Sequence, residues 1–259
     1  MRVAEIFRSI QGEGRLTGAE SIFVRTSGCN LRCRWCDTPY ASWTPEGEDL
    51  SVEEIAGRVE ELATATPEEG TAQTPSARPT VAALWSDGER SEGPVSHVVL
   101  TGGEPMLFAE LIPLTAGLRR TKMHVTIETA GTLYLPVACD LMSISPKLSN
   151  STPPADRDAR WTWRHETNRR APEVVRRLIS EHDYQLKFVV GNLEDCTEVE
   201  RYLADFPEID RSRAMLMPQG TKQQELAARA EWLEPYCAEH DLAYCPRRQI
   251  QWFGSARGT

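Results

Sequence analysis

Three cysteines stand close together near the amino end of the chain, at Cys29, Cys33 and Cys36, in a C-x3-C-x2-C spacing. Thiolates are strong ligands of iron and zinc, and this spacing lets one loop wrap one metal centre. A structural zinc site needs four protein ligands, whereas three thiolates on a [4Fe–4S] cluster leave one iron open to a reacting ligand. The spacing favours an open cluster. A zinc site completed by a distant His or Cys, and a loop without metal, remain alternatives.

A second motif, TGGEP, begins at Thr101 and ends an apolar run. Paired glycines allow a close approach of the backbone, and Glu104 can accept hydrogen bonds from an ammonium group. An ordinary tight turn is the alternative interpretation. Both motifs follow predicted strands, and ligand sites gather at the carboxyl ends of parallel strands. We therefore predict that both motifs belong to one site.

The elements that must position these residues are strands that alternate with helices. The predicted strands are residues 22–26, 97–101, 125–129, 140–145, 185–190 and 214–217. The predicted helices are residues 52–62, 107–119, 172–180, 194–203 and 223–239, with Pro113 and Pro235 expected to kink or shorten their helices. Strands separated by helical crossovers pair in parallel. We predict one α/β domain over residues 1–259 with a mostly parallel sheet.

Two segments break this alternation. Residues 64–94 are rich in Pro, Thr, Ala, Ser, Glu and Gly and are predicted to form a flexible insertion. Residues 149–171 are polar and carry several arginines; a lid, a partner surface and an irregular loop are all open interpretations.

Composition excludes several classes of protein. The 259 residues carry a formal charge of −9, which argues against a nucleic-acid grip spread over the whole surface. No apolar run reaches the ~20 residues that span a bilayer, so no membrane span is expected. The amino end lacks the pattern of a secretory leader, and the seven cysteines are an odd number. We expect a protein of the reducing cytoplasm.

The cysteine spacing together with GGEP resembles the signature of the radical S-adenosylmethionine (SAM) enzymes. Further runs narrow the resemblance: IQGEG at 10–14, Arg25, CDT at 36–38, ETAGT at 128–132 and SPK at 145–147. This ordered set resembles the 7-carboxy-7-deazaguanine synthase family, from Glu5 to about Lys147 and more loosely at 217–220. The resemblance implies an incomplete six-stranded (β/α) barrel of the radical SAM type.

The resemblance also implies an activity. The family converts 6-carboxy-5,6,7,8-tetrahydropterin to 7-carboxy-7-deazaguanine with loss of ammonia, in the biosynthesis of queuosine and related 7-deazapurines. A 5′-deoxyadenosyl radical abstracts hydrogen from C6, SAM is used catalytically, and Mg²⁺ assists the ring contraction. A homodimer and a low-potential electron donor, such as a flavodoxin or ferredoxin, are implied as well.

Site residues follow from the resemblance by position. The [4Fe–4S] cluster is assigned to Cys29, Cys33 and Cys36. SAM is assigned to Trp35, Gly103, Glu104, Ser145, Pro146, Lys147, Met217, Pro218, Gln219 and Gly220. The substrate is assigned to Ile10, Gln11, Gly12, Glu13, Arg25 and Thr101, with Arg25 on its carboxylate. Mg²⁺ is assigned to Thr38, and Asp37 is the rival ligand because carboxylates commonly bind this ion.

Some residues keep more than one interpretation. Glu128 either faces the pocket or caps a helix. His124, His165, His182 and His240 are interpreted as bystanders, and the four scattered cysteines as small buried hydrophobes. Residues 245–254 resemble the family variant that ends in an arginine-rich strand, and are expected to close the pocket. Two rival functions stay open: a radical activase acting on a polypeptide, and a zinc-stabilised binding module.

Overall fold

The computed structural model describes residues 1–65, 95–254 and 256–258, in which nine strands form one sheet of order β3-β1-β2-β4-β5-β6-β7-β8-β9. The six predicted strands are confirmed: β2 (Glu20–Thr26), β4 (His97–Gly102), β5 (His124–Thr129), β6 (Leu141–Ile144), β7 (Tyr184–Val190) and β8 (Ala214–Pro218). They pair in parallel, and the short β9 (Ala243–Tyr244) continues the sheet beside β8. Most of the predicted insertion, residues 66–94, lies outside the described residues.

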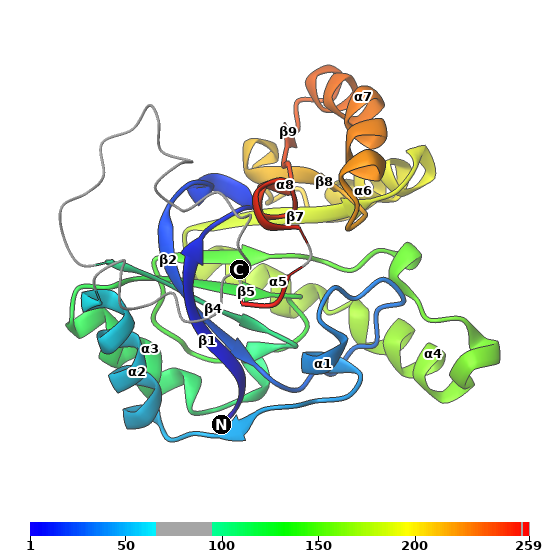
Figure 1. Cartoon of the computed structure of the whole chain (residues 1–259). Coiled ribbons are helices and arrows are strands. Elements are labelled where there is room, and N and C mark those ends of the chain that lie inside the picture. Colours follow the sequence, from blue (N-terminus) through cyan, green and yellow to red (C-terminus); the bar gives the residue numbers. More distant parts are fainter. Residues whose placement is uncertain (66–94, 255, 259) are drawn as a thin grey trace.

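An amino-terminal hairpin adds strands that the sequence analysis did not predict. Strand β1 (Arg2–Ile10) runs antiparallel to β2, and β3 (Glu48–Asp49) runs antiparallel to β1. The turn of the β1–β2 hairpin reaches β7, where the Arg15 backbone N–H donates to Gln185 Oε1 at 2.9 Å. Because three strands stand between β2 and β7 in the sheet, this contact requires the sheet to curl (Figure 1). The open, curled sheet confirms the predicted incomplete barrel.

Helices cover the outer face of the sheet. They are α2 (Val52–Thr64), α3 (Leu111–Arg120), α5 (Pro172–Glu181), α6 (Leu193–Asp205) and α7 (Gln223–Glu239). Helix α2 begins with a capping box in which Ser51 and Glu54 exchange hydrogen bonds, and it buries Ile55, Val59 and Ala63, four residues apart, against the sheet. Helix α3 starts later than predicted, so Pro113 falls in its first turn, where a missing N–H is tolerated. Helix α7 continues past Pro235 to Glu239.

Two segments differ from their predictions. Residues 149–171 contain a 3-10 turn and a helix, α4 (Ala155–Arg169), instead of an irregular loop. Its apolar residues are few, and the non-helical backbone at Asp158 interrupts it, so the sequence shows no clear helical period. The predicted arginine-rich strand near the carboxyl end is the helix α8 (Arg248–Phe253). The remaining elements are α1 (Pro39–Ser42) and further 3-10 turns at Gly14–Leu16, Pro105–Leu107 and Arg211–Arg213.

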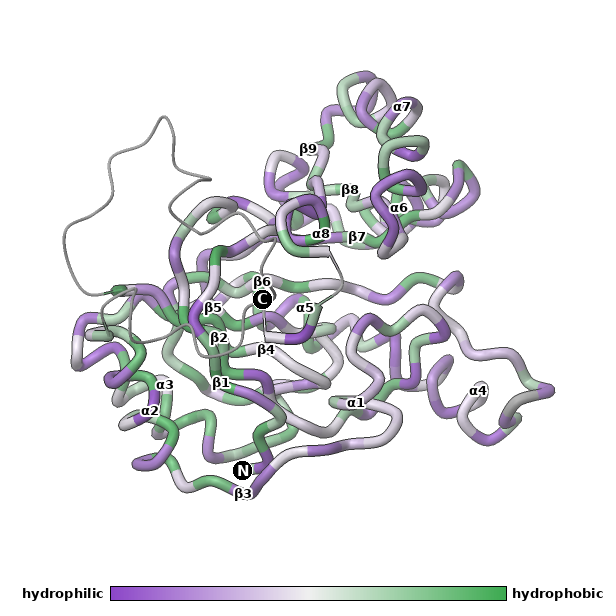
Figure 2. The backbone as a smooth tube through the Cα atoms, in the orientation of Figure 1, coloured by the Kyte–Doolittle hydropathy of each residue, from purple (hydrophilic) through white to green (hydrophobic). Residues whose placement is uncertain are grey.

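Alternation along the strands separates a hydrophobic outer face from a polar inner face. On β7, Leu186, Phe188 and Val190 pack into the core under the helices, while Lys187 points to the inner side. Figure 2 shows the hydrophobic residues gathered along the strands, whereas α4, which projects to one side, is largely hydrophilic. The inner face of the curled sheet is thus available for a site. Among the described residues no helix is both long and apolar enough to cross a membrane.

Candidate functional site

A cleft of about 350 Å³ opens on the inner face of the curled sheet. It brings together most of the predicted site residues: Ile10, Gln11, Gly12, Glu13, Arg25, Cys29, Cys33, Trp35, Cys36, Thr38, Thr101, Gly103, Ser145, Lys147 and Met217. Five predicted residues do not line it: Glu104, Pro146, Pro218, Gln219 and Gly220. Glu128 lines the cleft, which decides between its two interpretations in favour of the pocket.

The three cysteines of the predicted cluster loop, residues 27–37, all line this cleft and are free thiols. Burial, together with the Glu104 carboxylate, raises the pKa of Cys29 to about 12, and burial raises the pKa of Cys33 to about 11. Buried thiols of this kind lose their protons when a metal supplies compensating charge. Over residues 1–65, 95–254 and 256–258, no three His, Cys, Asp or Glu converge closely enough for a single metal ion. Three thiols on one loop are a donor set that suits a [4Fe–4S] cluster with one open iron.

The two glycines of TGGEP lie so close to the backbone at Thr26 and Gly28 that neither position has room for a side chain. A Cβ atom on Gly103 would lie 2.0 Å from the carbonyl oxygen of Gly28, and one on Gly102 would lie 2.2 Å from that of Thr26. The Glu104 backbone N–H then donates to Gly28 O at 2.8 Å. The end of β4 therefore packs directly on the loop that carries the thiols, and a side chain at either glycine would separate them.

Glu104 itself is fully buried behind this contact. Its carboxylate accepts from Thr129 Oγ1 at 2.7 Å, from the Ala130 backbone N–H at 2.8 Å and from the Met106 backbone N–H at 3.1 Å. Burial raises the pKa of Glu104. A carboxylate has about four acceptor positions, so three protein donors leave one for a further donor.

A buried ionic cluster, defined here by Glu13, Lys187 and Glu128, forms the polar centre of the cleft. Lys187 Nζ lies 3.0 Å from Glu13 Oε2 and 3.0 Å from Glu128 Oε1, and the lysine side chain is 4% exposed. Thr101 Oγ1 donates to Glu128 Oε2 at 2.9 Å. Burial alone would raise the pKa of Glu13, but Lys187 and Arg247 lower it to about 2. Glu13 therefore stays charged beside the buried ammonium group.

The carboxyl-terminal segment closes over this cluster. Arg247 pairs with Asp37, reaches Glu13 Oε1 at 3.4 Å, and donates to the carbonyl oxygen of Gly220 at 2.6 Å. Gln249 Nε2 donates to Glu13 Oε1 at 2.5 Å. The segment also explains Gly12, because a Cβ there would lie 2.3 Å from Gln249 Oε1. The expectation that this segment closes the pocket agrees with these contacts.

Arg25, the predicted carboxylate partner, stands beside the cluster loop on β2. Its Nε lies 2.6 Å from Glu5 Oε1, which also accepts from Tyr40 OH at 2.7 Å. Arg257 approaches the same glutamate at 3.6 Å. A substrate carboxylate at Arg25 would share the guanidinium with Glu5, whose position is fixed by three donors.

The SPK run lies near the predicted tryptophan. Lys147 Nζ donates to Ser145 Oγ at 2.7 Å and stands 5.9 Å from the ring centroid of Trp35, and Trp35 Nε1 donates to the carbonyl oxygen of Asn150 at 3.0 Å. An ammonium group above an indole is attracted by its face. These three side chains form one wall of the cleft.

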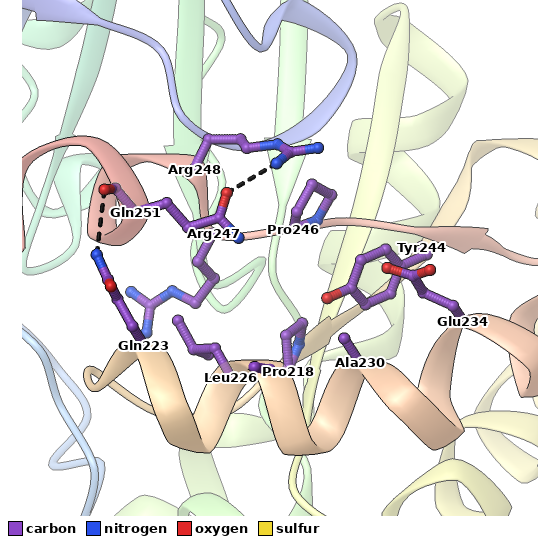
Figure 3. A pocket seen from close by; sticks show the side chains of 11 residues that line it. Pro218, Gln223, Leu226, Ala230, Glu234, Tyr244, Pro246, Arg247, Arg248 and Gln251 are labelled. Atoms are coloured by element: carbon purple, nitrogen blue, oxygen red, sulfur yellow. Dashed lines mark hydrogen bonds between the residues drawn. The ribbon is translucent and has the colours of Figure 1, made fainter.

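A second hollow of about 750 Å³ lies outside the cleft, between α7 and residues 244–251 (Figure 3). Leu226, Ala230 and Pro246 give it an apolar floor, and Gln223 Nε2 donates across it to the carbonyl oxygen of Gln251 at 3.2 Å. It shares Arg247 with the cleft. The carboxyl-terminal segment therefore separates the two spaces.

Several cleft residues were missed by the sequence analysis, and Lys187 is foremost among them. Its signal was present: in the run Gln185–Leu186–Lys187–Phe188–Val189 the polar residues alternate with apolar ones, which places Lys187 on the inner face. Glu5 and Tyr40 gave no comparable signal, because their role depends on the unpredicted strand β1 and on helix α1.

His165, interpreted as a bystander, contacts the cysteine loop instead. It is fully buried on α4, and its Nδ1 accepts from the Arg32 backbone N–H at 3.1 Å. Burial lowers the pKa of His165 to about 4, so the ring is neutral. Helix α4 thus lies against the loop that carries Cys29 and Cys33.

The chain is similar to known proteins over nearly its whole length. The chain is 41% identical over 258 residues to the 7-carboxy-7-deazaguanine synthase of Rhodopirellula baltica, covering 99% of this chain and 88% of that protein. It is 36% identical to the enzyme of that name from Halobacterium salinarum, covering 99% of this chain and 92% of that one. The crystal structure of QueE from Escherichia coli shares the fold with a TM-score of 0.59 at 22% identity, covering 95% and 93% of the two chains. A scan against models of protein families gives no match.

Proposed function

The chain belongs to the family of 7-carboxy-7-deazaguanine synthases, and on this premise we propose that it converts 6-carboxy-5,6,7,8-tetrahydropterin to 7-carboxy-7-deazaguanine and ammonia. The observation that carries the proposal is one cleft that collects three free thiols from one loop together with a buried, charged cluster. The thiols suit a [4Fe–4S] cluster, and the charged cluster suits a polar heterocycle.

When bound, the [4Fe–4S] cluster and SAM would supply radical chemistry for hydrogen abstraction at C6 of the substrate, and a donor such as a flavodoxin or ferredoxin would supply the electron. The chain's part is to hold and orient the reactants. Cys29, Cys33 and Cys36 would hold the cluster, and Ser145, Lys147, Trp35 and Met217 would hold SAM from the neighbouring wall. Pro146 and residues 218–220 do not line the cleft, and the fully buried Glu104 would act indirectly, by holding the end of β4 through Thr129, Ala130 and Met106.

The substrate would lie between Arg25 and the buried ionic cluster. The guanidinium of Arg25 suits the pterin carboxylate. Glu13 and Glu128 are acceptors for the N–H groups of the pterin ring, and Thr101 and Gln11 hold Glu128 in place through bonds of 2.9 and 3.5 Å. Lys187 and Arg247 keep Glu13 charged, so this carboxylate accepts hydrogen bonds and does not donate them.

Magnesium is assigned to Thr38 in this proposal. Thr38 lines the cleft beside Cys36, 3.9 Å between Oγ1 and Sγ, where a hydroxyl and substrate oxygens can surround the ion. Asp37 is engaged by Arg247, and a magnesium ion there would have to displace a buried arginine. The ion pair therefore supports Thr38 over its neighbour.

Anaerobic reconstitution followed by turnover tests the proposal. Iron and sulfide are measured per chain, and the loaded protein is then given SAM, a low-potential reductant, Mg²⁺ and carboxytetrahydropterin. We expect equal amounts of deazaguanine and ammonia, with little SAM consumed. Cys33→Ala should lose the cluster, whereas Cys139→Ala, outside the cysteine loop, should keep it. Light scattering on the same samples tests the expected homodimer.

Three outcomes would contradict the proposal. Zinc without iron and sulfide would indicate the zinc-stabilised binding module. SAM cleavage without pterin turnover would indicate another radical enzyme, such as an activase of a polypeptide. A cluster in Cys33→Ala equal to that of the unaltered chain would remove the assigned ligand set.

A further inference from the structure

The cysteine loop has little regular structure of its own. Residues 27–37 form no helix or strand, although they carry all three thiols. A loop of this kind has many conformations, and holding its ligands in place before metal binding requires contacts from elsewhere. The segment 149–168, which includes all of α4 but its last residue, supplies such contacts from outside the barrel (Figure 1).

A directed chain of hydrogen bonds runs from the loop through His165. The Arg32 backbone N–H donates to His165 Nδ1 at 3.1 Å, and because an amide N–H can only donate, the proton of the neutral ring is on Nε2. Nε2 then donates to Ser151 Oγ at 2.9 Å, and the Ser151 hydroxyl donates to the carbonyl oxygen of Leu148 at 2.6 Å. Each group in this chain has the partner that its chemistry requires.

The same histidine and serine hold the backbone on both sides of Cys33. Arg32, before it, is bonded to His165, and the Arg34 backbone N–H, after it, donates to the carbonyl oxygen of Ser151 at 2.8 Å. The orientation of the Cys33 side chain depends on these two peptide units. His165 and Ser151 therefore determine where its sulfur points.

Two further contacts join the same segment to the loop. Asn168 Nδ2 donates to the carbonyl oxygen of Asn30 at 3.1 Å, and the Arg32 guanidinium lies 4.0 Å from the ring centroid of Trp161. All of these contacts fall on residues 30–34, which lie between and around two of the thiols. One segment thus restrains the central residues of the loop.

We propose that residues 149–168 are a clamp that fixes Cys33 in its ligating position before a cluster is present, with His165 as the positioning residue. The proposal rests on the proposed function, because it takes the three cysteines as cluster ligands. It gives the polar segment with no assigned role a specific task in cluster assembly and retention.

His165→Ala and His165→Asn test the clamp. Asparagine places an acceptor oxygen where Nδ1 stood, and alanine leaves the Arg32 N–H without a partner. In the cluster-free chain we measure amide hydrogen exchange of the peptide covering 29–37. In the reconstituted chain we measure the rate of iron loss to a chelator and the electron paramagnetic resonance spectrum of the reduced cluster. We expect exchange and iron loss to rise about tenfold in the alanine variant, as for one lost buried hydrogen bond, and to stay within about threefold in the asparagine variant.

His182→Ala is the matched control, since His182 is half-buried and contacts Cys139 rather than the cysteine loop. It should match the unaltered chain in every readout. If His165→Ala does not fold, Asn168→Ala removes the Asn30 contact from a more exposed position, and we expect the same changes at about threefold.

The outcomes separate the clamp from the proposed function. Exchange and iron loss in His165→Ala equal to the unaltered chain would overturn the clamp and leave the function standing. Failure of the unaltered chain to take up iron would overturn the proposed function. The amide-exchange measurement needs no cluster, so it would still test the clamp. Equally fast amide exchange in His165→Ala and His165→Asn would also overturn the clamp, because the hydrogen-bond acceptor at residue 165 would then not be what protects the loop.

Discussion

Lys187 on β7 donates to Glu13 across 3.0 Å, a contact between residues 174 positions apart in the chain. The lysine comes from the inner face of the sheet, and the glutamate from the turn of the amino-terminal hairpin. Because Glu128 is bonded to the same ammonium group, this contact joins three separate parts of the fold at the centre of the cleft. Lys187 supplies the positive charge that the two carboxylates share in the cleft.

Removing this ammonium group should destabilise the protein strongly. Lys187→Met would leave the partly buried Glu13 and Glu128 without their shared cation, which costs about 3–5 kcal/mol. Urea unfolding at pH 7 measures the change. Lys222→Met, where the lysine is 77% exposed and pairs with Glu225, should change the free energy of unfolding by less than about 0.5 kcal/mol. Equal losses in the two variants would contradict the role of the buried cluster.

Gly103→Ala should abolish cluster binding. The new methyl group would stand 2.0 Å from the carbonyl oxygen of Gly28 and would push the cysteine loop away from the end of β4. Iron and sulfide per chain after reconstitution measure the effect. Gly57→Ala is the control, because nothing lies within 4 Å of its Cβ and alanine favours helix α2 by up to about 1 kcal/mol. A full cluster in Gly103→Ala would show that the loop can move without loss.

The strands of the barrel were predictable because each is a short β-branched or apolar run between turns, and six of them were placed within a few residues. The cysteine spacing and TGGEP likewise predicted two parts of the cleft. Strand β1 was not predicted, because its apolar and polar residues do not alternate cleanly. Lys187 lay in a predicted strand, but it meets Glu13 only because the sheet curls. No local sequence pattern predicts that curl.

Helix α4 was not predicted from the sequence for a different reason. Its residues Trp161 and His165 lie four apart and face the cysteine loop, but most of its other residues are charged or polar and its third large aromatic or histidine side chain, Trp163, is exposed. A helix that packs on a loop needs a narrow contact stripe, so its sequence lacks the broad apolar face that predicts a helix on a sheet. The interpretation of His165 as a bystander failed for the same reason.

Thr38→Ala should reduce the stimulation of turnover by Mg²⁺, because it removes the assigned oxygen ligand while leaving the cysteines in place. Asp37→Asn is the matched variant: it weakens the pair with Arg247 and should leave the magnesium response largely intact. Turnover against Mg²⁺ concentration measures both. A lost response in Asp37→Asn, with a normal one in Thr38→Ala, would reverse the assignment.

Arg25→Ala should raise the KM for the pterin at least about tenfold, since a charged hydrogen bond to its carboxylate is worth about 1.5–3 kcal/mol. Iron per chain should not change. Arg177→Ala, an exposed arginine that pairs with Glu181 on α5, serves as the control and should leave the KM as it was. An unaltered KM in Arg25→Ala would remove the carboxylate contact from the proposal.

Acid should destabilise the fold through His97, which lies at the start of β4 away from the cysteine loop. Burial, and then the neighbouring His124, lowers the pKa of His97 to about 4 from 6.5. The unfolded chain therefore binds a proton that the folded chain does not between these values. The contribution of the neutral His97 to the free energy of unfolding is therefore fully present above pH 6.5. It is lost as the pH falls to 4, and the loss is up to about 3 kcal/mol.

Urea unfolding of His97→Gln against the unaltered chain at pH 7 and pH 4.5 measures this contribution. Glutamine does not titrate, so the free energy of unfolding should fall less with acid in the variant. His240→Gln, at an exposed site, should follow the unaltered chain. Parallel pH profiles for all three proteins would exclude His97 as the cause.

The hairpin that reaches β7 sets the order in which the molecule can be completed. Gly14 meets Cys245 across 231 positions of the chain, so the turn of this hairpin gains that partner only after the strands between the two residues have been made. Contacts this distant in sequence are slow to form during folding. Refolding of the whole chain should accordingly be limited by the closure of the hairpin turn onto β7 and Cys245.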